Sequence, residues 1–138
     1  MNAIKGIFTT LIVAAVTSVS AAAQDLPQWH QVRGGRWEVP IEVAMDAANA
    51  IKASAIDIVP KNRRPMRDVA GYTVQYQGVL EEGARLVRLS GACSLWGRTP
   101  EQLRADWLVV ADGGDCYYDA IYDPAVKRIT AIRAHGHG

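Results

Sequence analysis

The chain has almost no net charge. Its 138 residues include 15 Lys and Arg against 14 Asp and Glu, which gives a formal charge of +1. The first 23 residues hold one lysine and no acid, so the remainder carries no formal charge. A neutral chain has no long-range field to attract polyanions or anionic membranes. The composition therefore argues against nucleic-acid binding.

Motifs of the common enzyme classes are also missing. The sequence has no G-x-S-x-G elbow, no H-E-x-x-H, no P-loop and no G-x-G-x-x-G. A hydrolase with paired carboxylates stays possible, because two acids can converge from anywhere in a fold, but no pair stands out. We therefore expect no catalytic residues and no cofactor.

The N-terminus has the form of a secretory signal peptide. Lys5 precedes an apolar run from Ile7 to Val19, and small residues follow at Ser20 to Ala23. This order of a positive charge, a short apolar stretch and an Ala-x-Ala site is typical of signal peptides. The run is shorter than the roughly 20 residues that span a bilayer. We expect residues 1–23 to be cleaved and the protein to be periplasmic or secreted.

The only two cysteines, Cys93 and Cys116, both remain after cleavage. In an oxidising compartment such a pair usually forms a disulfide, and closing a segment of this length stabilises a fold by roughly 3 kcal/mol. The alternative is a reactive thiol at Cys93, which needs a base to activate it. The histidines lie at His30 and in the last four residues, so the disulfide is favoured.

One helix is predicted near the start of the mature chain. Residues 24–38 hold Pro27, a Gly34-Gly35 pair and two tryptophans, and we expect an irregular N-terminal arm that the tryptophans dock onto the body. Pro40 suits a helix start. Apolar or small residues then recur at intervals of three and four, which predicts an amphipathic helix; they are Ile41, Ala44, Met45, Ala48, Ile51 and Ala55.

The rest of the chain predicts strands joined by short turns. The candidate strands are residues 72–77, 85–93, 107–111 and 116–122, and residues 128–133 can form a last strand. Glu81-Glu82-Gly83 and Asp112-Gly113-Gly114-Asp115 are the expected turns. Thr99-Pro100-Glu101-Gln102 has the form of a capping box and predicts one helical turn to about Arg104. Short links favour antiparallel neighbours. We expect a single α+β domain over residues 39–138, in which the N-terminal helix packs on a four-stranded antiparallel sheet.

The cysteines conflict with a plain meander of these strands. Cys93 would end the second strand and Cys116 would begin the fourth, at the opposite edge of the sheet. Disulfide Cα atoms lie within about 7 Å of each other. Either residues 90–105 fold back across the sheet, or one strand assignment is wrong.

Two sets of residues are candidates for binding. The first is the basic loop with Arg63, Arg64 and Arg67, for which a solvated connector is the plainer interpretation. The second is aromatic, and alternation places its members on both faces of the sheet: Trp107, Tyr117, Tyr118 and Tyr122. Core packing is the commoner use of such residues. An open sheet face is the main reason to expect an interaction role.

The sequence gives less support for a metal site than for a binding surface. The aspartates at 112, 115, 119 and 123 lack the D-x-D-x-D-G pattern and later Glu of a calcium loop. His135 and His137 offer imidazoles that suit Zn, Cu or Ni, but two ligands on a tail make a weak site. We expect no resident metal.

Residues 107–124, WLVVADGGDCYYDAIYDP, resemble a group of small exported bacterial proteins. In that group a strand ending in D-G-G leads to a Cys, aromatics and a Y-D-P turn. The similarity extends over residues 70–134 through Gly71-Tyr72 and Cys93, and the present chain departs from it in ending with His-Gly-His-Gly. The group has no established activity, so the resemblance implies an exported small domain and no reaction. By element order alone, the chain is similar to cystatin-type and nuclear-transport-factor-type α+β folds.

These observations favour an exported, non-catalytic binding module for a protein or cell-envelope component. We expect it to use the open sheet face or the loops at 61–67 and 94–104. The alternative is a small-ligand pocket protein or minor hydrolase, with its pocket around Tyr72, Tyr76, Trp107 and Tyr118.

Overall fold

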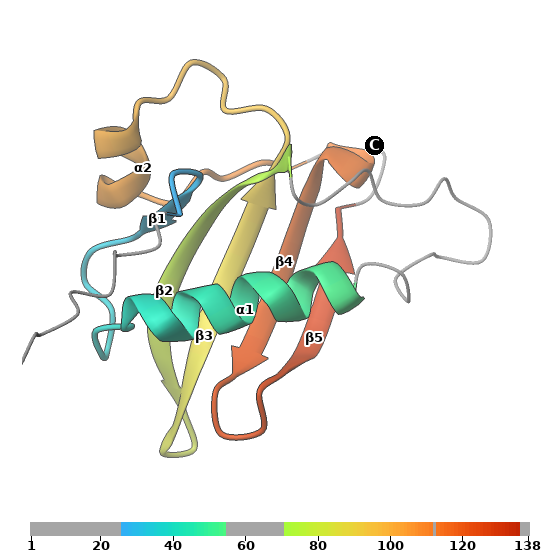
Figure 1. Cartoon of the computed structure of the whole chain (residues 1–138). Helices are drawn as coiled ribbons and strands as arrows, with labels where there is room; N and C mark the ends of the chain where they lie inside the picture. Colours follow the sequence, from blue (N-terminus) through green and yellow to red (C-terminus); the bar gives the residue numbers. More distant parts are fainter. Residues whose placement is uncertain (1–25, 55–70, 112, 136–138) are drawn as a thin grey trace, which may run out of the picture.

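Five strands form one mixed sheet in the computed structural model, which describes residues 26–54, 71–111 and 113–135, without the side chain of Asp115. The strands stand side by side in sequence order and a long helix crosses one face (Figure 1). Their bounds are β1 Trp29–Gln31, β2 Thr73–Glu81, β3 Ala84–Ala92, β4 Tyr117–Asp123 and β5 Arg128–Ala134. The predicted α+β class is confirmed.

Two tight turns set the register of the long strands. Glu82 and Gly83 connect β2 to β3 with φ values of 49° and 80°, the two positive values that a type I′ hairpin requires. Asp123 ends β4, and its Oδ1 accepts a hydrogen bond from the N–H of Ala125 at 2.9 Å. This contact holds the turn before β5. Both turns lie at the same end of the sheet (Figure 1).

Helix α1, Ile41–Ser54, covers one face of the sheet and makes the main core with it. Ala44, Ala47 and Ile51 are its buried residues, so the helix approaches the strands closely. The predicted helix is confirmed. Its buried face differs slightly from the predicted one, because Ala47 is buried in place of Ala48 and Ile41 is exposed. The sheet contributes Tyr72, Val74, Tyr76, Val87, Leu89, Tyr118, Ala120 and Tyr122 to this core.

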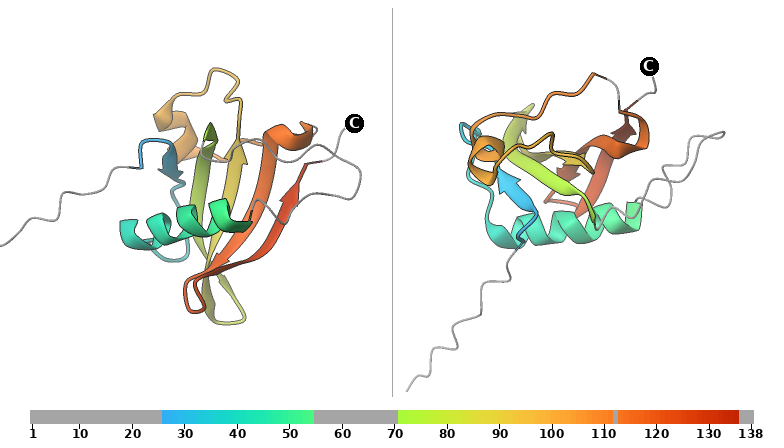
Figure 2. Two further views of the ribbon diagram at one scale, coloured as in Figure 1. Left: turned by 45° about the vertical axis from the view of Figure 1, so that its right-hand side comes forward. Right: turned by 90° about the horizontal axis from the view of Figure 1, so that it is seen from above.

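Residues 93–116 cover part of the other face, which we call the outer face. From the end of β3 the chain runs out to the short helix α2, Pro100–Ala105, beside β1, and returns to β4 (Figures 1 and 2). Buried Gln75 joins the two layers, since its amide donates to the carbonyls of Leu103 and Asp106 at 2.7 and 2.8 Å. Its oxygen accepts the N–H of Leu108 at 2.7 Å.

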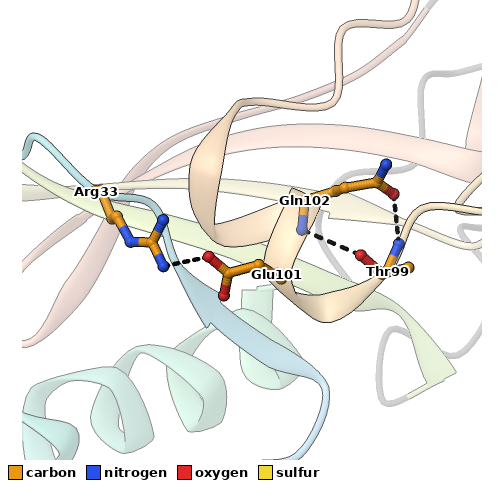
Figure 3. Close-up of polar contacts among 4 residues, drawn as sticks. All are labelled: Arg33, Thr99, Glu101 and Gln102. Carbon is orange, nitrogen blue, oxygen red and sulfur yellow. Dashed lines mark hydrogen bonds and ion pairs between the residues drawn. The ribbon is translucent and has the colours of Figure 1, made fainter.

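The start of α2 confirms the capping box predicted at Thr99. The Thr99 hydroxyl accepts the N–H of Gln102, and the Gln102 side chain accepts the N–H of Thr99 in return (Figure 3). Pro100 follows in the first turn. Arg33 forms an ion pair with Glu101 on the exposed side of the helix (Figure 3). Such exposed pairs contribute little to stability, so the cap and the apolar contact of Leu103 hold α2 in place.

The strand predicted at residues 107–111 was wrong, and this removes the conflict over the cysteines. These residues run across the outer face, tied to Gln75 through Leu108, and β3 pairs directly with β4. Ala92 therefore lies opposite Tyr117, so that Cys93, which follows Ala92, and Cys116, which precedes Tyr117, come next to each other. The hairpin predicted at 112–115 is also absent from the described residues, where a 3-10 helix η2, Gly114–Cys116, leads into β4.

The sheet has five strands where four antiparallel ones were expected, because residues 107–111 lie outside it while β5 and part of the N-terminal arm, β1, belong to it. β1 pairs in parallel with β2, with Trp29 beside Val74. Trp29 packs on Tyr76 at 5.9 Å between ring centroids, and the indole N–H of Trp37 donates to the carbonyls of Val79 and Leu86. The arm is thus docked by its tryptophans, as predicted, but is not wholly irregular.

The predicted signal peptide lies outside the described residues. Within the described part of the chain, no helix has the length and apolar character needed to span a membrane.

A substitution at Gly91 tests how tightly the strand β3 packs against the ring of Tyr118. A Cβ at this position would lie 2.0 Å from the ring of Tyr118, which is fully buried. We expect Gly91→Ala to lower the free energy of unfolding by about 1–3 kcal/mol, because the ring has no space to move into. At Gly71 nothing lies within 4 Å of such a Cβ, so Gly71→Ala serves as the control. Equal stability of the two variants in denaturant unfolding would contradict this packing.

His30 predicts a pH dependence of stability. It is 6% exposed on β1, and burial, with a smaller contribution from the charge of Arg104, lowers its pKa below the usual 6.5. Below about pH 6.5 the unfolded chain takes up a proton that the folded protein resists, so stability falls as the pH falls through this range. We expect His30→Gln to show a smaller loss between about pH 7 and 5.5 in denaturant unfolding. Parallel curves for the two proteins would exclude this role.

Candidate binding site

The Cys93–Cys116 disulfide closes residues 93–116 into a loop that we call the disulfide-closed segment. The two Cα atoms are 5.0 Å apart, and the N–H of Cys93 donates to the carbonyl of Cys116 at 2.8 Å. The predicted pairing is confirmed, and the pair is compatible with an oxidising exported location. Both ends of the segment are thereby fixed to the adjoining ends of β3 and β4.

Trp96 is held in place although it is largely exposed. Its indole N–H donates to the Tyr117 hydroxyl at 2.6 Å, and that hydroxyl donates to the carbonyl of Ser94 at 3.4 Å. The residue is 74% exposed and has a φ of 50°, a left-handed conformation that is unfavourable for a bulky side chain. Residues held in such sparsely populated backbone conformations cluster at active sites and ligand-binding sites.

Polar groups continue this arrangement along β4 and β5. His135, directly after β5, places its ring 6.0 Å from that of Tyr117, and its Nε2 lies 2.9 Å from Asp119 Oδ2. Arg133 Nη2 approaches the same carboxylate oxygen at 3.8 Å. The Asp119 side chain is 33% exposed and that of Arg133 is 81% exposed. An acceptor and a donor of opposite charge are therefore both open to solvent.

Together these side chains form what we call the outer-face cluster: Trp96, Tyr117, Asp119, Arg133 and His135. It lies at the end of the sheet away from the two hairpin turns. A pocket of about 280 Å³ adjoins it, lined by Val110, Ala111, Arg133, Ala134 and His135. This volume is at the lower limit for ligand pockets. The arrangement suits binding of a polar ligand that also has an apolar surface.

The predicted aromatic residues separate onto the two faces as alternation requires. Tyr117 belongs to the outer-face cluster. Tyr118 and Tyr122 are buried against α1, where Tyr118 stacks on Tyr72 at 5.7 Å. Burial raises the pKa of both hydroxyls. Tyr118 and Tyr122 therefore pack in the core, which was the alternative to a binding role.

Trp107 is half-buried on the outer face, and the guanidinium of Arg88 lies over its ring at 4.2 Å. A cation in this position gains from the negative face of the indole. The contact occupies one face of the Trp107 ring. The other predicted binding residues, Arg63, Arg64 and Arg67, lie outside the described residues.

The residues considered as metal ligands have other roles or lie outside the described residues. Asp119 pairs with His135, and Asp123 holds a turn. Asp112, the Asp115 side chain and His137 lie outside the described parts. Within the described ranges, no three His, Cys, Asp or Glu side chains come close enough together to hold a metal ion.

Trp96, Asp119, Arg133 and His135 were not predicted as binding residues. Trp96 lies in the 94–104 loop that was proposed for binding, and Asp119 and His135 were considered only as metal ligands. A tryptophan followed by glycine in a polar loop was the available signal for Trp96. Nothing in the sequence placed Arg133 beside Asp119, because their contact depends on the register of β4 and β5.

Comparison of this chain with models of protein families, with curated proteins and with solved structures found no match. The resemblance through the D-G-G and Y-D-P residues therefore stays a prediction.

The disulfide predicts a measurable loss on reduction. Replacing both Cys93 and Cys116 by serine is expected to lower the free energy of unfolding by about 3 kcal/mol, because the unfolded chain regains the freedom of the closed loop. Denaturant unfolding of the variant should match that of the wild type in dithiothreitol and should not change when dithiothreitol is added. Equal stability of oxidised wild type and variant would contradict a structural role.

Proposed function

We propose that the protein is an exported, non-catalytic binding module for a protein or cell-envelope component, and that the outer-face cluster is its binding site. The observation that supports this most directly is Trp96, whose ring is exposed while its indole N–H is hydrogen-bonded and the turn around it is closed by the N–H of Arg98, which donates to the carbonyl of Leu95 at 2.9 Å. A ring fixed before binding loses little conformational entropy when a ligand covers it.

The composition of the cluster also supports a binding role. Tryptophan, tyrosine and arginine are the residues that most often carry binding energy at interfaces. Here Trp96 and Arg133 are exposed, while the buried Tyr117 contacts Trp96 and His135 beside the disulfide. The export part of the proposal rests on the predicted signal peptide and is supported by the disulfide.

The alternative, a small-ligand pocket protein or minor hydrolase, has less support. Of the four residues expected around its pocket, Tyr72, Tyr76 and Tyr118 are buried in the core beneath α1. Trp107 lies on the opposite face of the sheet, against Arg88. The described positions of these residues therefore do not form one pocket.

Affinity capture from a cell-envelope extract of the natural host tests the proposal. The mature wild type is the bait, Trp96→Ala is the variant, and Val126→Ala, half exposed in the β4–β5 turn, is the matched control. We expect mass spectrometry to recover a component with wild type and V126A that W96A retains at least about tenfold less well, as for a central interface residue. Recovery by all three baits alike would exclude the cluster as the binding site.

A further inference from the structure

The side chains around Trp96 have a composition that limits the kind of ligand. Its neighbours in the sequence are small or polar, namely Ser94, Gly97, Arg98 and Thr99, and only Leu95 is apolar. The other large apolar residues exposed among the described residues are Val109, in the disulfide-closed segment, and Ile41, Leu80 and Val126, in α1, β2 and the β4–β5 turn. Protein interfaces usually need a continuous apolar centre, which this distribution does not supply.

A single flat aromatic ring beside charged hydrogen-bonding groups matches the chemistry of a sugar. In glucose-type pyranoses linked by β bonds, the hydroxyls point outward around the ring, so that both ring faces carry only C–H groups. Such a face packs on an indole, while the hydroxyls at the edge need donors and acceptors. We infer that the outer-face cluster binds a β-linked glucose-type glycan, with one sugar ring stacked on Trp96. This inference rests on the proposed function.

The orientation of Trp96 fits stacking. Its N–H edge is turned to Tyr117 at 2.6 Å, so the exposed area belongs to the ring faces and the opposite edge. The hydrogen bond limits the rotation of the indole before a ligand arrives. The left-handed backbone at Trp96 and the next residue, Gly97 with a φ of 74°, turns the loop so that the ring stands outward.

The polar end of the cluster supplies partners for hydroxyl groups. His135 and Arg133 both contact Oδ2 of Asp119, so a sugar hydroxyl would donate to Oδ1. The Arg133 guanidinium, largely exposed, can donate to a second hydroxyl or to an acetamido carbonyl. The adjoining pocket, lined by Val110, Ala111 and Ala134, has room for a small substituent such as an acetyl group.

Binding of defined tetrasaccharides tests the inference. Chitotetraose, which carries acetamido groups, and cellotetraose, which does not, are titrated into the oxidised mature protein and followed by calorimetry and tryptophan fluorescence. We expect saturable binding of at least one. Tighter binding of chitotetraose would indicate an N-acetylated envelope glycan as the source, and tighter binding of cellotetraose an unsubstituted polysaccharide.

Two variants connect binding to the cluster. Trp96→Ala is expected to weaken binding at least about tenfold and to remove the fluorescence change, whereas Val109→Ala, also exposed in the disulfide-closed segment, should leave both unchanged. Asp119→Asn should weaken binding without removing the fluorescence change. Near-identical thermal unfolding of the variants would show that the fold is kept.

Failure of this inference differs from failure of the proposed function. No binding of either tetrasaccharide at millimolar concentration, or binding that Trp96→Ala leaves unchanged, would overturn the glycan inference. If capture from envelope extract then still depends on Trp96 and the recovered component is a protein, the binding module stands with a protein partner.

Discussion

Direct pairing of β3 with β4, fixed by the disulfide next to it, determines the rest of this architecture. Because Ala92 lies opposite Tyr117, the residues between these strands have no position left in the sheet. They must leave at one end and return to the same end. The disulfide closes that path, and the described part of the segment lies on the side of the sheet that α1 does not cover (Figure 2).

The path of this segment explains both the closed and the open parts of the outer face. Near β1, the side-chain amide of Gln75 is buried. Its N–H groups donate to the carbonyls of Leu103 and Asp106, and its oxygen accepts the N–H of Leu108, so burial leaves no polar atom of this amide without a partner. Near β4, the chain passes so close to Tyr117 that a Cβ at Gly113 would lie 2.0 Å from its ring. Glycine at this position lets Tyr117 keep the orientation in which it contacts Trp96 and His135.

Local signals in the sequence predicted the elements that depend on local interactions. The cap formed by Thr99 and Gln102, the turn at Gly83 and the helix that begins near Pro40 each need only neighbouring residues, and each is present. Residues 107–111 have the composition of a strand, yet their apolar side chains serve equally well as a cover over a sheet face. β1 is three residues long, which is too short to show an alternating pattern in the sequence. It forms a strand because it pairs with β2, more than forty residues away in the sequence.

The candidate site was predictable only in part for the same reason. Alternation along β4 correctly separated Tyr117 from Tyr118, because side-chain direction within a strand is a local property. Which of the two faces stays open is not local: it depends on where residues 93–116 lie, and therefore on the pairing of β3 with β4. The position of Trp96 also depends on that arrangement, because its indole is held by Tyr117 on β4. With Cys93 and Cys116 joined at the ends of β3 and β4, its indole meets the Tyr117 hydroxyl, so the ring that we propose for binding is positioned by contacts that the segment alone cannot make.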